Sequence, residues 1–175
     1  MKRLPFRWPF IIFVLYIFFQ TLTVNKFNIR VYAIILNETK DAVLISDEFQ
    51  LGMRMTKFPG GGLDFGEGII DCLKREAIEE FGQEIEIESH FYTTDYFQKA
   101  LFYEDSQLIS IYYTASFKEP IQFKVSEKPF DYGLEENGKQ SFRWSKLKDM
   151  DKEIFSFPID KKVAGLIFKI LNSEF

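Results

Sequence analysis

The stretch that decides the fold is KFPGGGLDFGEGIIDCLKREAIEEFG, residues 57–82, in which glycine-rich chain leads into an acid-rich segment. On a helix, at about 100° per residue, Glu76, Glu79 and Glu80 fall within roughly one third of the circumference. Like charges this close repel one another, so a chain that keeps them together usually supplies a compensating cation. Carboxylate oxygens favour a hard cation, and we therefore expect Mg²⁺ or Mn²⁺, with Ca²⁺ as an alternative.

The other side of the same segment has the spacing of a packing face. Ile70, Leu73, Ala77 and Phe81 project about a quarter-turn from the acids, which predicts an amphipathic helix over about 68–81. A solvated acidic surface is the usual interpretation of a charge run on a helix. That interpretation leaves the glycine-rich chain in front of the helix unexplained.

The glycines mark a place where the backbone turns and approaches another group closely. Gly60, Gly61 and Gly62 are consecutive, and two further glycines bracket Glu67. Such a loop could cradle a phosphate, for which we select Gly61 and Gly62, or lend a carbonyl to a metal. A tight turn without a ligand is the other interpretation.

The whole stretch resembles the signature of the Nudix hydrolase superfamily, G-x5-E-x7-R-E-U-x-E-E-x-G-U, where U is an apolar residue. All seven fixed positions agree between Gly61 and Gly82. By chance, such agreement has a probability on the order of 10⁻⁸ per starting point. The last position departs, because Gln83 stands where an apolar residue is expected. This departure bears on packing after the helix more than on chemistry, since it follows all the acids.

The resemblance implies a metal-dependent pyrophosphatase that cleaves a nucleoside diphosphate linked to another group. The metal ligands that it implies are Glu67, Glu76, Glu79, Glu80 and the backbone carbonyl of Gly60 or Gly61. Of these, Glu79 and Glu80 would be the main ligands, and Glu76 a ligand or the base that deprotonates the attacking water. Arg75 would hold Glu76 by a charge-assisted bond. A diphosphate approaching so many acids would be repelled, so the metal has to neutralise both sides.

A second acidic segment, DYGLEENG at 131–138, precedes a predicted strand. Similar enzymes often present an extra catalytic acid on a loop at such a place. Because a metal-bound carboxylate is a weak base, we select Glu136 as a further catalytic candidate, with Glu135 as the alternative. A solvated turn is the more common interpretation of such a segment.

Composition fits one core and narrows the function classes. The chain has 175 residues, 46% of them apolar, and no Ser/Gly linker, so we expect one catalytic domain over 26–175. Its 22 basic and 26 acidic residues form no basic patch, which disfavours binding to nucleic-acid polymers. The single cysteine, Cys72, excludes an intrachain disulfide, and we expect it to be a packing residue. The lone His90 has no nearby nucleophile, which argues against a Ser/His/Asp or Cys/His hydrolase.

Apolar patterning predicts strands mixed with two helices, an α/β fold. We expect an α/β/α sandwich with a mixed sheet, the arrangement that the Nudix resemblance also implies. The predicted strands are 28–36, 42–47, 84–97, 107–118 and 140–144. A C-terminal amphipathic helix is indicated by the spacing of Val163, Leu166, Ile167, Ile170 and Leu171, with Asp160 as its cap.

The first 25 residues differ from the rest. An apolar run from Trp8 to Phe19 follows three basic residues, but it is shorter than the ~20 residues that span a bilayer. It also lacks a small-x-small cleavage site. Three interpretations stay open: an anchor extended to Val24, an accessory helix, or an extension from a misassigned start codon, which we favour slightly. We expect a cytoplasmic protein, with anchoring through residues 8–24 as the alternative.

The function we expect is hydrolysis of a phosphoanhydride bond in a small nucleotide: a nucleoside triphosphate, nucleotide sugar, dinucleotide or ADP-ribose. A non-catalytic module that senses a nucleotide on the same fold is the alternative. Such a module would tolerate loss of motif acids, and here all are present. An isomerase of an allylic diphosphate would need an extra acid or thiol, for which Cys72 is poorly placed. Self-association as a homodimer is left open.

Overall fold

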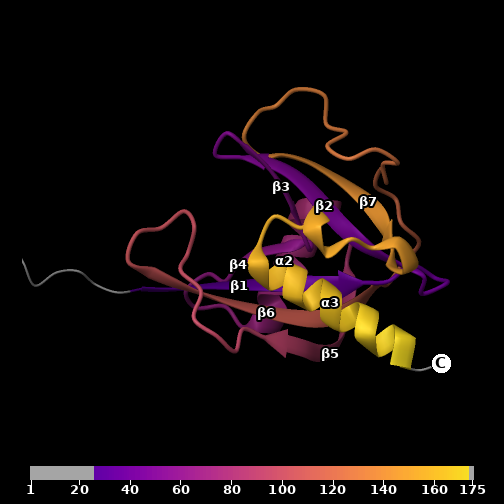
Figure 1. The fold of residues 1–175 in the computed structure, drawn as a ribbon. Helices are drawn as coiled ribbons and strands as arrows, with labels where there is room; N and C mark the ends of the chain where they lie inside the picture. The colour runs from indigo at the N-terminus through magenta and orange to yellow at the C-terminus, as the bar shows by residue number, and fades with distance from the viewer. Residues whose placement is uncertain (1–25, 174–175) are drawn as a thin grey trace, which may run out of the picture.

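The computed structural model describes residues 26–173, and its chain path is drawn in Figure 1. The strands and α-helices are β1 (Lys26–Ile35), β2 (Ala42–Gln50), β3 (Met53–Lys57), β4 (Gly60–Gly62), α2 (Ile69–Phe81), β5 (Ile85–Thr93), β6 (Ser106–Phe117), β7 (Lys139–Lys146) and α3 (Pro158–Ser173). Two short 3₁₀ turns, η1 (Leu147–Asp149) and η2 (Lys152–Ile154), lie between β7 and α3.

The strands form two sheets. The four-stranded sheet has the order β4-β1-β6-β5, in which β1 and β6 are parallel and the other pairs antiparallel. The second sheet is antiparallel, with the order β3-β2-β7. In Figure 1, α3 crosses in front of the sheet that holds β1 and β6, while β2, β3 and β7 lie together above it.

The two helices cover opposite faces of the mixed sheet. Along β1, Val31, Ala33 and Ile35 belong to the cluster that contains Leu73 and Phe81 of α2. The alternate residues of the same strand, Tyr32 and Ile34, belong to the cluster that contains residues of α3. Because successive side chains of a strand point to opposite faces, this alternation places β1 between the helices. The predicted α/β/α sandwich with a mixed sheet is thereby confirmed.

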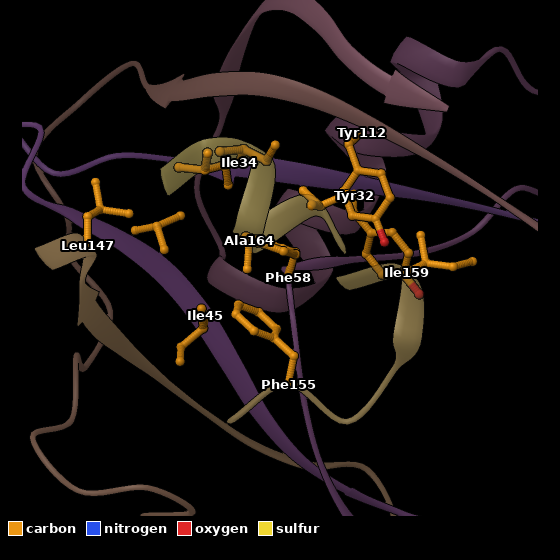
Figure 2. Packing of buried hydrophobic residues seen from close by; sticks show 12 residues of the cluster. Tyr32, Ile34, Ile45, Phe58, Tyr112, Leu147, Phe155, Ile159 and Ala164 are labelled. Carbon is orange, nitrogen blue, oxygen red and sulfur yellow. The ribbon is translucent and has the colours of Figure 1, made fainter. Parts of the chain in front are cut away.

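The α3 side of the core is aromatic at its centre, as Figure 2 shows. Phe58, which directly follows β3, stacks on Phe155 with ring centroids 4.7 Å apart and meets Tyr112 edge-on at 5.8 Å. Ile159 and Ala164 of α3 close the cluster. Phe58 is fully buried, so the chain just before the glycines is held by packing on both sides.

Some predicted elements have different bounds. The glycine loop is partly a strand, because Gly60–Gly62 pairs with β1, and β3 was not predicted at all. The strand predicted over 84–97 ends at Thr93. Ile70 was predicted to face the core but is 36% exposed, whereas the neighbouring Ile69 packs against the α2 cluster.

The capping role predicted for Asp160 is wrong. The helix α3 begins two residues earlier, at Pro158, and Asp160 is a buried residue of its first turn. Its Oδ1 accepts a hydrogen bond of 2.6 Å from the hydroxyl of Tyr112 on β6. The acid therefore joins the helix to the sheet instead of capping the helix.

The apolar segment predicted at 1–25 lies outside the described residues. Between residues 26 and 173, no helix has the length and apolar character needed to cross a membrane. The expectations of a homodimer and of a cytoplasmic location stay predictions.

Candidate active site

The glycine strand β4 is built against the middle of β1. Gly60, Gly61 and Gly62 lie opposite Tyr32, Val31 and Arg30 in antiparallel register. Gly60 has φ +127°, and a Cβ on it would lie 2.2 Å from the carbonyl oxygen of Val31. Only glycine adopts this conformation at such a close approach, so the sequence fixes where the strand passes.

The next glycine meets the acidic face of α2. A Cβ on Gly61 would lie 2.1 Å from Oε1 of Glu76. The helix is held in this place by its buried residues and ends at Gly82, whose φ of +67° gives a left-handed cap. The Glu76 carboxylate therefore rests directly on the glycine strand.

Arg75 connects three groups of the motif. Its Nη2 donates to Oε1 of Glu67 at 2.6 Å and to the carbonyl oxygen of Gly62 at 2.9 Å, and its Nη1 donates to Oε1 of Glu76 at 2.9 Å. These hydrogen bonds from Arg75 lower the pKa of Glu67 to about 2. The predicted bond between Arg75 and Glu76 is present, and the same guanidinium also holds Glu67.

Glu80 lies on the inner side of α2, where its side chain is only 10% exposed. Its Oε2 accepts from the backbone N–H of Gly60 at 2.9 Å, and its Oε1 accepts from Nε2 of Gln140 at 2.8 Å. Burial raises the pKa of Glu80, although these hydrogen bonds and the nearby Lys57 oppose the shift. The carboxylate is thus fixed beside the glycine strand from two directions.

A buried ammonium completes this corner of the site. The Nζ of Lys57 donates to the carbonyl oxygen of Gly60 at 2.8 Å and lies 3.5 Å from Oε1 of Glu80 and 3.3 Å from Oε2 of Glu48. Burial alone would lower the pKa of Lys57, but Glu80 and Glu48 together raise it above its usual value. A cation therefore lies between a carbonyl oxygen and a motif carboxylate.

Glu79 differs from the other motif acids. Its side chain is 58% exposed, and within residues 26–173 its carboxylate pairs with Nη1 of Arg75, at 3.4 Å. Glu76 and Glu80, four residues apart, share the face of α2 that meets β4, whereas Glu79 lies toward solvent. The assignment of Glu79 as a main metal ligand stays a prediction.

The donor set fits a divalent cation chemically. The atoms around Gly60 are hard oxygens, two carboxylates and one carbonyl, and an ammonium already lies among them. Within residues 26–173, however, no three His, Cys, Asp or Glu side chains are arranged as they stand to hold a metal ion.

The second acidic segment lies apart from these contacts. Glu135 forms an ion pair with Arg54 of β3, and Glu136 lies 3.8 Å from Nζ of Lys139. Both glutamates are exposed, and their ion pairs in the described chain join them to β3 and β7, not to α2. The catalytic role of Glu136 stays a prediction.

Two further residues of the motif, Cys72 in α2 and Gln83 just after it, hold the surrounding structure together. Cys72 is fully buried, its Sγ lies 3.4 Å from the carbonyl oxygen of Gly62, and burial raises the pKa of its thiol to about 12. Gln83, the departure from the signature, donates to the carbonyl oxygen of Pro120 and accepts from the N–H of Gln122. The amide group of Gln83 therefore has hydrogen-bond partners for both its oxygen and its nitrogen, and it fixes the chain that follows β6.

Sequence reasoning did not identify Lys57, Gln140 or Glu48 as site residues. A signal was available for Lys57, a cation three positions before the first of the three glycines. Nothing in the sequence relates Gln140 to Glu80, because 60 positions separate them. Their contact exists only after β7 has paired with β2.

The fold and site are those of an α/β/α sandwich that presents an acid-bearing helix to a strand of glycines. The family model described as the NUDIX domain matches residues 26–163. The chain therefore belongs to the NUDIX family, and the enzyme class expected from the sequence, a Nudix-type pyrophosphohydrolase, is confirmed at the level of the family. No curated protein matches the chain.

Solved structures of similar fold agree with this assignment. The chain is similar to a NUDIX hydrolase from Nitrosomonas europaea, with 18% identity, a TM-score of 0.61, and coverage of 83% of this chain and 90% of that one. It is also similar to the ORF135 protein of E. coli, with 18% identity, a TM-score of 0.61, and coverage of 87% of this chain and 96% of that one. A third similar structure is an ADP-ribose pyrophosphatase from Streptococcus suis, with 16% identity, a TM-score of 0.54, and coverage of 85% of this chain and 94% of that one. At these identities, the likeness concerns the fold.

Proposed function

We propose that the protein is a Mg²⁺- or Mn²⁺-dependent hydrolase that cleaves the pyrophosphate bond of a nucleoside diphosphate linked to another group. The observation that carries this proposal is the meeting of Glu76 and Glu80 with the glycine strand. Glu76 rests on Gly61, and Glu80 accepts from the N–H of Gly60. Two carboxylates beside the backbone carbonyl groups of this strand offer hard oxygen donors, the kind that Mg²⁺ and Mn²⁺ prefer, and this supports the proposal.

The metal would be held by Glu76, Glu79, Glu80 and the carbonyl oxygen of Gly60, with Glu67 as a further ligand, direct or through water. When bound, such an ion neutralises phosphate charge and lowers the pKa of a coordinated water. Arg75 lowers the pKa of Glu67, and its Nη1 and Nη2 fix the directions of the Glu76 and Glu67 carboxylates. Glu76 serves as a ligand or as the base that receives the proton of the attacking water.

The glycine strand has a second role in this proposal. Gly61 and Gly62 carry no side chain that could block a phosphate, so a diphosphate can come close to the backbone beside the acids. The carbonyl of Gly62 is already engaged by Arg75, which keeps the strand in place. Glu136 remains the proposed additional acid, delivered by the segment between β6 and β7.

The proposed substrate class is a small nucleotide: a nucleoside triphosphate, a nucleotide sugar, a dinucleotide or ADP-ribose. The similar structure from Streptococcus suis carries the name of an ADP-ribose pyrophosphatase, which supports including that substrate among the candidates. The net charge of −4, without a basic patch, supports a small substrate over a nucleic-acid polymer.

The test is a hydrolysis screen over these four substrate groups with Mg²⁺, with Mn²⁺ and with a chelator. We expect metal-dependent turnover of at least one substrate, and product analysis then identifies the broken bond. Glu80→Gln should reduce turnover by about 10²-fold or more, because it removes a charged ligand at the same size. The matched control is Glu84→Gln, since Glu84 is exposed and paired with Lys118 beyond the helix.

Two results would overturn the proposal. The first is full activity in the chelated wild type, and the second is wild-type turnover by purified Glu80→Gln. Tight nucleotide binding without turnover of any substrate would instead support the non-catalytic sensing module.

A further inference from the structure

We propose that Lys57 is an internal counter-cation that a divalent metal has to displace. In the metal-free protein its ammonium holds the carbonyl oxygen of Gly60 and the carboxylate of Glu80, and it withdraws when the metal takes these oxygens. This inference rests on the proposed function, because it concerns the same metal-binding oxygens. It makes Lys57 a positioning residue that sets the metal affinity of the site.

The contacts of Lys57 are those of a cation in a ligand cage. Its Nζ lies 2.8 Å from the Gly60 oxygen and 3.5 Å from Oε1 of Glu80, and the side chain is only 6% exposed. Lysine is almost never this deeply buried unless it is paired. The ammonium therefore compensates the buried charge of Glu80 in the absence of another cation.

The ammonium and a metal ion exclude each other. Both would be bound to the same two oxygens, so their charges would lie within a few ångströms of each other in a largely buried corner. Repulsion between such charges is strongest where water is excluded. Glu80 can neutralise either cation, but it carries one negative charge and cannot neutralise both.

A place for the displaced ammonium exists beside the site. Glu48, at the end of β2, has its Oε2 at 3.3 Å from Nζ. The ring of Tyr32 lies under the same Nζ, with its centroid at 6.0 Å. A small rotation of the side chain toward Glu48 therefore keeps an anionic partner and releases the Gly60 oxygen. Displacement can occur without exposing an unpaired charge.

The first experiment measures Mn²⁺ binding by titration calorimetry at pH 8, without substrate, on wild type, Lys57→Met and Lys74→Met. Methionine has the length of lysine and removes its charge. Lys74, an exposed residue of α2, gives the same charge change without contact to these oxygens. We expect Lys57→Met to bind Mn²⁺ about fivefold more tightly or better, and Lys74→Met to stay close to wild type. Melting temperatures without metal should fall for Lys57→Met only.

The outcomes separate this inference from the proposed function. Equal or weaker Mn²⁺ binding by a folded Lys57→Met, with binding by the wild type intact, overturns the displacement and leaves the proposed function standing. An equal gain in Lys74→Met also overturns it, because net charge would then explain the change. Absence of Mn²⁺ binding in the wild type overturns both proposals.

A second experiment needs no substitution, and so remains decisive if Lys57→Met does not fold. In uniformly ¹⁵N-labelled protein, the buried and hydrogen-bonded ammonium of Lys57 should give a resolved Nζ signal. Adding Mg²⁺ should shift or broaden this signal together with the amide signals of Gly60 and Gly61. If the two amide signals move while the Lys57 signal does not, the ammonium is not displaced, and the inference is wrong.

Discussion

Gly61 of β4 lies directly against the carboxylate of Glu76 on α2, and a Cβ on this glycine would be 2.1 Å from Oε1. Real Cβ atoms essentially never lie within 3.0 Å of another heavy atom outside their chain neighbours. Even the methyl group of an alanine at position 61 would therefore displace the Glu76 carboxylate. The acid is the far end of a flexible side chain, and it can move without unfolding the helix.

Gly61→Ala should therefore separate stability from activity. We expect the melting temperature to change little, because the displaced atoms belong to a partly exposed side chain. We expect kcat on the substrate found in the screen to fall by about 10²-fold, since misplacing a positioned group by about 1 Å has effects of this size. Steady-state kinetics and thermal melts on the same preparation measure both.

The control for this change is Gly165→Ala in α3, on the other side of the mixed sheet from Glu76. A Cβ there would have no neighbour within 4 Å, so neither kcat nor the melting temperature should fall below the wild-type value. Wild-type kcat in Gly61→Ala would show that the place of Glu76 against the glycine has no part in the reaction.

Arg75 should determine the titration of Glu67. The paired guanidinium lowers the pKa of Glu67 to about 2, whereas an unpaired glutamate titrates near 4.5. Because the folded-state pKa is depressed, the resulting stabilisation is present above about pH 4.5 and is lost as the pH falls toward 2. In Arg75→Lys, which keeps the charge but not the planar fork, we expect the Glu67 pKa to move up toward 4.5. Carboxyl ¹³C NMR titrations measure this shift directly.

Arg54→Lys provides the comparison for that experiment. Arg54 of β3 also pairs with a glutamate, Glu135 in the segment before β7, but both side chains are exposed. The Glu67 titration should be unaffected by it. An unchanged Glu67 pKa in Arg75→Lys would mean that the charge of residue 75, and not its fork, controls this acid.

The acidic helix was predictable because its information is local. The period of Leu73, Ala77 and Phe81 fixes which stripe of α2 packs in the core, and the acids then lie on a second stripe about a quarter-turn away. The bond from Arg75 to Glu76 is equally local, since the residues are adjacent. Runs of apolar residues also predicted β1 and β6, because both faces of these strands are covered. The predicted bounds lie within two residues of the observed ends.

The rest of the site depends on contacts between distant segments, which a single sequence does not encode visibly. Lys57 reaches Glu80 across 23 positions, because β3 and β4 turn back along β2 and β1. The glycines were interpreted as a loop since three glycines have low strand propensity, and pairing with β1 overrides that preference. Asp160 resembles a helix cap in sequence, and only the position of Tyr112 explains its burial.

A buried ion pair between the central strand β2 and the edge strand β7 of the second sheet should control stability. Asp47 of β2 is fully buried and accepts from Nε of Arg143 at 2.6 Å and from the hydroxyl of Thr56 at 2.6 Å. Arg143→Met leaves the Asp47 charge without its cation, so we expect a loss of about 3–5 kcal/mol in the free energy of unfolding. Urea denaturation followed by circular dichroism measures it.

The exposed pair of Arg54 and Glu135 is the matched control, because Arg54→Met should cost less than about 1 kcal/mol. The double variant Asp47→Asn/Arg143→Met should lose less than the sum of the two single changes, since no buried charge is left alone. Strict additivity would mean that the two side chains do not stabilise the fold as a pair.

Asp160 should make the protein less stable as the pH rises. Burial raises the pKa of this acid to about 7, and its Oδ2 has no hydrogen-bond partner among the described residues. A folded-state pKa above the unfolded value means that the stabilisation is complete below about pH 4 and is lost as the pH rises through 7. Asparagine keeps the acceptor for Tyr112 but does not ionise, so Asp160→Asn should gain roughly 1–3 kcal/mol relative to wild type between pH 5 and pH 8. Urea midpoints across this range test the prediction, and parallel curves for the two proteins would show that Asp160 ionises without cost inside the fold.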